Sequence, residues 1–363
     1  MALSIWESRW LQLIAASILI YFIYMDATLY ILLQSMPFTP AVPTDSPDGN
    51  SLDPMSQIAL KTLLLDPPNH YIHLPLAVFF NEVTNFSKLF PSITPNIISI
   101  SHVFVALCGM TMVWSDRLSV RQVGVLLFEV RSYLDALDGA VARSRSHHSL
   151  IHLDMGSSGF FIDGICDTFG SIALYMGVLV CLTASAPLLT HREKGGCFSP
   201  SYLVLPLSQT SKDSEEWRTN GGAVHSAHKT ITHQKRRVLI VVICSALQMM
   251  IGSLFWNHTL SIYHSLLEIN PSTNHQRVVQ IDVFKSQTLW IIILCWRLCN
   301  PHALMEMILI SIFIDRLWEF LRWTQYYGFV VIFTVTVVTQ AHIHYVTSLM
   351  NSDFVVESVI GYK

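Results

Sequence analysis

Four aspartates in two short segments of this chain are spaced so that they could bind metal ions. The first segment contains Asp135 and Asp138, and the second contains Asp163 and Asp167. Residues three or four positions apart lie on the same face of a helix. Each pair is therefore predicted to share one helical face. Two such helices packed side by side would bring the four carboxylates together at the border of a membrane.

A cluster of carboxylates at a membrane border needs a counter-charge, because nearby like charges and burial both oppose ionisation. Divalent cations supply that charge. Ligands that are all oxygen favour hard ions, so we expect Mg²⁺ or Mn²⁺, with Ca²⁺ as an alternative. These ions neutralise phosphate oxygens and align an in-line displacement, which predicts phosphate chemistry.

Small residues accompany the aspartates on the same predicted faces. Gly139 and Ala142 follow Asp138, and Gly159 precedes Asp163 by one helical turn. Their small side chains would leave room for a bulky nucleotide against the helix backbone. Arg143 could bind a phosphate with two parallel hydrogen bonds.

The elements that position these residues are predicted to be membrane-spanning helices. Of the 363 residues, 52% are hydrophobic and 13% are charged, whereas soluble domains carry about 25% charged residues. The apolar residues form runs close to the length of about 20 residues that crosses a bilayer. The predicted spans are 11–33, 96–114, 119–134, 159–184, 238–256, 289–313 and 326–344. The fold class is therefore all-α and polytopic, and the small net charge of −3 gives no indication of nucleic-acid binding.

These spans divide the chain into four predicted parts. They are an N-terminal tip with a membrane anchor (1–34), a lumenal connector with an interfacial segment at Tyr71–Phe90 (35–95), a six-span catalytic core (96–345) and a C-terminal tail (346–363). Within the core, a polar stretch at 188–237 is predicted to be a cytoplasmic loop.

The distribution of Lys and Arg predicts a cytoplasmic N-terminus, because these residues favour cytoplasmic loops. Two N-glycosylation triplets, at Asn85 and Asn257, then lie on the opposite side. This topology places the segment between the two aspartate pairs in a lumen. Arg131 and Arg297 fall inside predicted spans, where we expect pairing with an acid or extension of the charge towards water.

The spacing of the aspartates and small residues resembles that of the CDP-alcohol phosphotransferases. The signature of that family is D-x2-D-G-x2-A-R followed by G-x3-D-x3-D, and every signature residue is present between Asp135 and Asp167. The resemblance implies a six-helix core, with an N-terminal anchor as an addition in this chain. It also implies site roles: two metal ions held by Asp135, Asp138 and Asp163, a candidate general base and nearby metal ligand in Asp167, and contacts to CDP from Gly139, Ala142, Arg143 and Gly159.

Three features resemble one branch of the family, the insect-type ceramide phosphoethanolamine synthases. They are the lumenal orientation, the N-terminal anchor and a long spacer, Ser144–Ser158, between the two parts of the signature. The resemblance implies a Golgi membrane enzyme that moves phosphoethanolamine from CDP-ethanolamine to the primary hydroxyl of ceramide and uses Mn²⁺ or Mg²⁺. The expected partners are CDP-ethanolamine, ceramide and the lipid bilayer, with a homodimer left open. The spacer is interpreted either as shaping substrate choice or as a solvated loop.

Two other functions share part of this pattern. An ethanolamine or choline phosphotransferase that acts on diacylglycerol would carry the same signature, so the signature does not choose between acceptors. A cation transporter could also use membrane carboxylates, but such sites more often lie at mid-membrane on broken helices.

Overall fold

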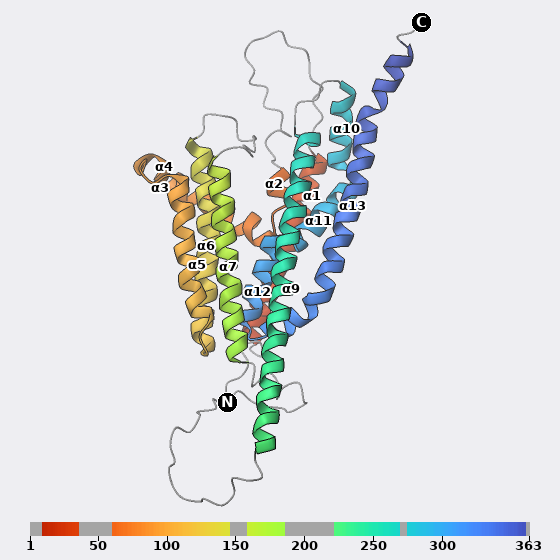
Figure 1. Cartoon of the computed structure of the whole chain (residues 1–363). Helices are drawn as coiled ribbons and strands as arrows, with labels where there is room; N and C mark the ends of the chain where they lie inside the picture. Colours follow the sequence, from red (N-terminus) through yellow and green to blue (C-terminus); the bar gives the residue numbers. More distant parts are fainter. Residues whose placement is uncertain (1–8, 36–59, 146–157, 186–220, 269–273, 361–363) are drawn as a thin grey trace, which may run out of the picture.

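The computed structural model describes residues 9–35, 60–145, 158–185, 221–268 and 274–360, and every regular element in these ranges is a helix (Figure 1). The elements are α1 (Arg9–Ser35), α2 (Leu60–Leu63), η3 (Asn69–His73), α3 (Leu74–Thr84), α4 (Phe86–Leu89), α5 (Pro95–Val113), α6 (Leu118–Arg145), α7 (Ser158–Ala184), α9 (Gly221–Leu267), α10 (Asn274–Lys285), α11 (Gln287–Cys299), α12 (Pro301–Phe313) and α13 (Leu317–Ile360). Within the described ranges, five helices are long and apolar enough to cross a membrane, or six if the bent pair α10–α11 is one span. The predicted all-α, polytopic fold is confirmed.

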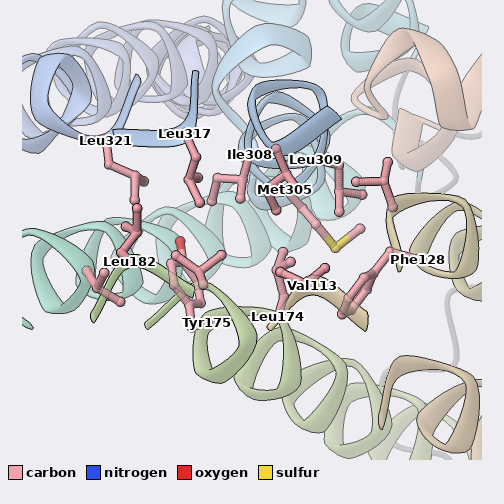
Figure 2. Close-up of a cluster of buried hydrophobic side chains, with 14 of the residues drawn as sticks. Val113, Phe128, Leu174, Tyr175, Leu182, Met305, Ile308, Leu309, Leu317 and Leu321 are labelled. Atoms are coloured by element: carbon pink, nitrogen blue, oxygen red, sulfur yellow. The ribbon is translucent and has the colours of Figure 1, made fainter. Parts of the chain in front are cut away.

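Helices α5, α6 and α7 form an antiparallel group that packs beside the long helices α9 and α13 (Figure 1). A continuous apolar core joins the two parts of the bundle. Figure 2 shows Phe128 of α6 and Leu174 of α7 on one side of this core and Met305 and Leu309 of α12 on the other. The core therefore fixes the position of α6 and α7, which carry the predicted site.

Glycines allow α5 and α6 to pack closely. A Cβ atom on Gly124 of α6 would lie 2.9 Å from the backbone nitrogen of Val113 in α5, and one on Gly109 of α5 would lie 3.0 Å from the ring of Phe128. Small residues permit this close approach in membrane proteins, where water does not drive helices together.

Several helices extend beyond the predicted spans. Helix α6 is continuous to Arg145, so the predicted span 119–134 is only its first part. The charged residues in the second half of α6 lower its hydropathy, and they are the residues of the candidate site. The polar stretch 188–237 is helical from Gly221 onwards, and α13 continues to Ile360 through most of the predicted tail.

The predicted span 289–313 is wrong, because it consists of two helices that meet at Asn300 and Pro301. Proline begins α12, and the Asn300 side chain caps that helix by accepting from the Ala303 amide at 2.7 Å. The Asn300 amide group also donates to the Leu64 carbonyl at 3.0 Å. Each 13-residue helix is about 20 Å long and could not cross a bilayer core of about 30 Å alone.

The segment predicted to be interfacial, Tyr71–Phe90, forms the end of η3 followed by α3 and α4. Helix α3 packs on α6 through buried Ala77, while Leu76, Phe79 and Val83 are exposed. The described part of the connector from η3 to α4 thus belongs to the helical bundle, and one apolar face of it remains exposed.

An ion pair ties the N-terminal anchor to the core. Arg297 of α11 is buried and its guanidinium lies 3.0 Å from the carboxylate of Asp26 in α1. The same guanidinium lies over the ring of Tyr71, whose hydroxyl donates to Asp26 at 2.5 Å. The prediction that Arg297 pairs with an acid is confirmed.

The close approach at Gly124 predicts a stability effect. We expect Gly124→Ala to lower the free energy of unfolding by about 1–3 kcal/mol, the range seen when a core is overpacked, because the new methyl group would press on the α5 backbone. Gly164→Ala is the matched control, since a Cβ at Gly164 meets no atom within 4 Å. The unfolding midpoint of purified protein in detergent measures both variants, and equal midpoints would contradict the packing argument.

Candidate metal centre

The predicted site residues lie on two helices, α6 and α7. Helix α6 carries Asp135 and Asp138, and α7 carries Asp163 and Asp167. Ligand atoms from Asp135, Asp163, Asp167 and a histidine of α5, His102, all lie within 4.8 Å of one another. The structure therefore brings together three of the four predicted aspartates and adds an imidazole.

His102 is a site residue that sequence reasoning missed. Its side chain is fully buried, and neither ring nitrogen has a hydrogen-bond partner among the described residues. A buried polar group normally has a partner, so these nitrogens are available to a ligand. The signal that could have found His102 is its position three residues after Ser99, which places two polar groups on one face of an apolar helix.

Asp138 lies beside this four-residue group. It is buried, and its carboxylate accepts a hydrogen bond from the Ser99 hydroxyl at 2.5 Å. Asp138 is close enough to Asp135 and Asp163 for the three charges to act on one another. Ser99 thus fixes the fourth carboxylate next to the cluster.

Arg131 of α6 supplies positive charge to the carboxylate cluster. Its guanidinium is buried and forms an ion pair with Asp167, which confirms the predicted pairing with an acid. Gly170 of α7 provides the space, because a Cβ there would lie 2.9 Å from the Arg131 Nε atom. The Asp167 side chain remains 32% exposed, so it is held by Arg131 and still accessible from outside the bundle.

The small residues and Arg143 lie where α6 ends and α7 begins. The Arg143 guanidinium lies over Gly139, where an added Cβ would be 3.1 Å from its Nη1 atom. Ala142 is exposed, and Gly159 is in the first turn of α7. These residues border the acidic cluster on the side towards the helix ends.

Arg145, the second residue of the spacer, fixes the end of α6. Its guanidinium donates to the carbonyls of Ser87, Phe90 and Ile93 at 2.8–3.2 Å. It therefore holds the end of α6 against the segment around α4. The rest of the spacer, residues 146–157, lies outside the described residues.

The charges of this site fit a divalent cation. Four carboxylates face the guanidinium groups of Arg131 and Arg143, which leaves two negative charges to be balanced. Three carboxylates and an imidazole are ligands that Mn²⁺ binds, and the imidazole makes the set less suited to Mg²⁺ or Ca²⁺. The buried nitrogens of His102 agree with this donor set, so the residues fit a bound metal ion.

Comparison with known proteins agrees with this geometry. A family model described as ceramide phosphoethanolamine synthase matches residues 4–352. This chain belongs to the ceramide phosphoethanolamine synthase family. One curated relative, the ceramide phosphoethanolamine synthase of Drosophila melanogaster, is 36% identical over 292 residues, which cover 80% of this chain and 69% of the relative. No solved structure matches the chain. The predicted resemblance to ceramide phosphoethanolamine synthases is confirmed.

The position of His102 predicts that it contributes to metal binding in this family member. We expect His102→Gln to weaken Mn²⁺ binding about 10-fold or more, in line with the losses seen when metal-site residues are altered. His258→Gln is the control, because His258 is exposed on α9. Electron paramagnetic resonance of free Mn²⁺ gives both affinities, and an unchanged affinity in His102→Gln would exclude His102 as a ligand.

Proposed function

We propose that this chain transfers phosphoethanolamine from CDP-ethanolamine to the primary hydroxyl of ceramide and releases CMP. The observation that carries the proposal is the convergence of Asp135, Asp163, Asp167 and His102 on helices α5, α6 and α7. Membership of the ceramide phosphoethanolamine synthase family and the name of the Drosophila relative supply the substrate pair.

The four converging residues would hold a divalent cation, and Asp138 would contribute to a second ion of the two-ion arrangement that the signature implies. When bound, these cations would neutralise the pyrophosphate oxygens and would stabilise the leaving phosphate. Ser99 keeps Asp138 oriented by its hydrogen bond. The role of the protein is to hold these carboxylates in place before substrate arrives.

The transfer forms a bond between the ceramide oxygen and the phosphorus of phosphoethanolamine, and it breaks the bond from that phosphorus to the phosphate oxygen of CMP. Asp167 would accept the proton of the ceramide hydroxyl, as a general base must lie near the proton that it removes. Arg131 orients Asp167 through their ion pair. Proton acceptance and metal binding would both use the Asp167 carboxylate. The variant Asp167→Asn separates the two roles, because nucleotide binding should persist without turnover if Asp167 acts chiefly as the base.

Arg143 and the small residues would bind the nucleotide. The Arg143 guanidinium, near Asp138 and over Gly139, could turn towards a phosphate. Ala142 and Gly159 leave the neighbouring backbone open to the cytidine.

The alternative of a cation transporter is less well supported by the helices. The four aspartates lie on continuous helices, whereas transporters more often place their ligands on broken helices.

The substrate pair can be tested with purified protein. We expect CDP-ethanolamine with ceramide to give the highest kcat/KM among four combinations, in which CDP-ethanolamine or CDP-choline is supplied with ceramide or diacylglycerol. Product formation is measured from labelled head group, with Asp163→Asn as the inactive control. Faster transfer to diacylglycerol would contradict the proposed acceptor.

We further propose a Golgi membrane with the site facing the lumen. Figure 1 shows α6 ending and α7 beginning at the upper end of the bundle, whereas α9 and α13 begin at the lower end. Lys235–Arg237 lie in the lower part of α9, and Arg316 directly precedes α13. Because Lys and Arg favour the cytoplasm, the lower end is the cytoplasmic one in this proposal.

An epitope tag at Ser146 tests the orientation. We expect the tag to be inaccessible to antibody when only the plasma membrane is permeabilised, and to become accessible after complete permeabilisation. A tag after Lys212 is the control and should be accessible in both conditions. Labelling at Ser146 under selective permeabilisation would show that the site faces the cytosol.

A further inference from the structure

A second group of metal-ligand side chains lies on η3, α6 and α12, away from the aspartate signature. Ligand atoms of His73, Glu129 and Glu306 lie within 4.8 Å of one another. Glu129 precedes Asp135 by six positions, which is about 9 Å along the axis of α6. This group is therefore a separate cluster that lies deeper in the bundle than the candidate metal centre.

Glu306 is the residue of this cluster that most clearly lacks compensation. It is 6% exposed, and its Oε1 atom has no hydrogen-bond partner among the described residues. The acidic residues Glu129 and Asp66 both act on it electrostatically, and its side chain also interacts with that of Glu129. A buried carboxylate oxygen without a donor is strongly unfavourable unless a cation or a proton lies beside it.

The Arg131 guanidinium does not neutralise the Glu306 carboxylate. Arg131 also acts on Glu306, but it is paired with Asp167 of the candidate metal centre. Its Nη1 atom lies 3.8 Å from the sulfur of Met305, the residue before Glu306. Arg131 thus lies between the two clusters, and its ion pair is with the candidate metal centre.

Hydrogen bonds fix His73 in the form that binds metals. Asn69 donates from its amide group to Asp66 at 2.9 Å, so the Asn69 side-chain oxygen is an acceptor. That oxygen lies 2.9 Å from His73 Nδ1, which must therefore carry the hydrogen. The other nitrogen, Nε2, lies 3.4 Å from a carboxylate oxygen of Glu129.

This arrangement has the features of a histidine oriented for metal binding. A metal-ligating histidine usually donates its second ring hydrogen to an oxygen acceptor, which sets the tautomer. In neutral His73 the Nε2 lone pair would face the Glu129 carboxylate, and a cation between the two would make this contact favourable. The Glu129 side chain is 33% exposed, which provides access for an ion.

We propose that His73, Glu129 and Glu306 form a second divalent-metal site, distinct from the aspartate centre. One imidazole and two carboxylates favour a first-row ion such as Mn²⁺ or Zn²⁺ over Mg²⁺ or Ca²⁺. The ion would join η3 of the connector to α6 and α12. It would thereby hold these helices in position beside Arg131, and so act on the active centre by positioning.

The test uses the full-length protein with the aspartate centre disabled by His102→Gln and Asp163→Asn. We expect this background to retain about one equivalent of Mn²⁺ or Zn²⁺, measured by titration and by mass spectrometry of the bound metal. Adding Glu306→Gln or His73→Gln should weaken this binding at least 10-fold. Adding Glu82→Gln, at an exposed glutamate of α3, should leave it unchanged.

A structural readout separates this proposal from the proposed enzymatic function. Mn²⁺ or Zn²⁺ should raise the unfolding midpoint of the disabled background, and Glu306→Gln should remove that shift. Retention of neither ion in the background would overturn the second site and would indicate that Glu129 and Glu306 share a proton. If the background fails to elute as a single species, bound metal is compared between wild type and Glu306→Gln. A difference of one equivalent supports the site, and equal amounts overturn it.

Discussion

The organisation of this protein depends on the repulsion between carboxylates held at close range among apolar helices. Asp135 and Asp138 on α6 face Asp163 and Asp167 on α7, and burial weakens the screening that water would provide. Arg131 offsets part of the charge by pairing with Asp167. In the proposed function, a divalent cation would balance the remaining negative charge and would in turn bind the pyrophosphate of the substrate.

Helix packing makes this concentration of charge possible. Glycines at 109 and 124 bring α5 against α6, so that Ser99 and His102 of α5 reach the carboxylates. Gly170 opens the space on α7 that the Arg131 guanidinium occupies. The apolar core shown in Figure 2 holds this group of helices against α12. These glycines thus allow both the close packing of the helices and the approach of the site residues to one another.

The aspartate faces could be predicted from the sequence because helical spacing alone sets which side chains share a face. The spacing of Ser99 and His102 indicates a polar face on α5, but the contact of that face with the aspartates depends on how closely α5 packs on α6. The break at Asn300 was missed since the apolar run 289–313 is long enough for one span, and the helical course of α6 to Arg145 was obscured by its charged residues. The substrate roles of the site residues remain predictions.

We propose that a metal ion makes the carboxylate cluster able to bind the nucleotide substrate. Isothermal titration of purified protein with CDP-ethanolamine, with and without Mn²⁺, tests it most directly. We expect binding that requires the metal, that is lost in Asp163→Asn and that persists in Asp167→Asn without turnover. Equally tight binding after complete removal of divalent metal would contradict the role of the metal.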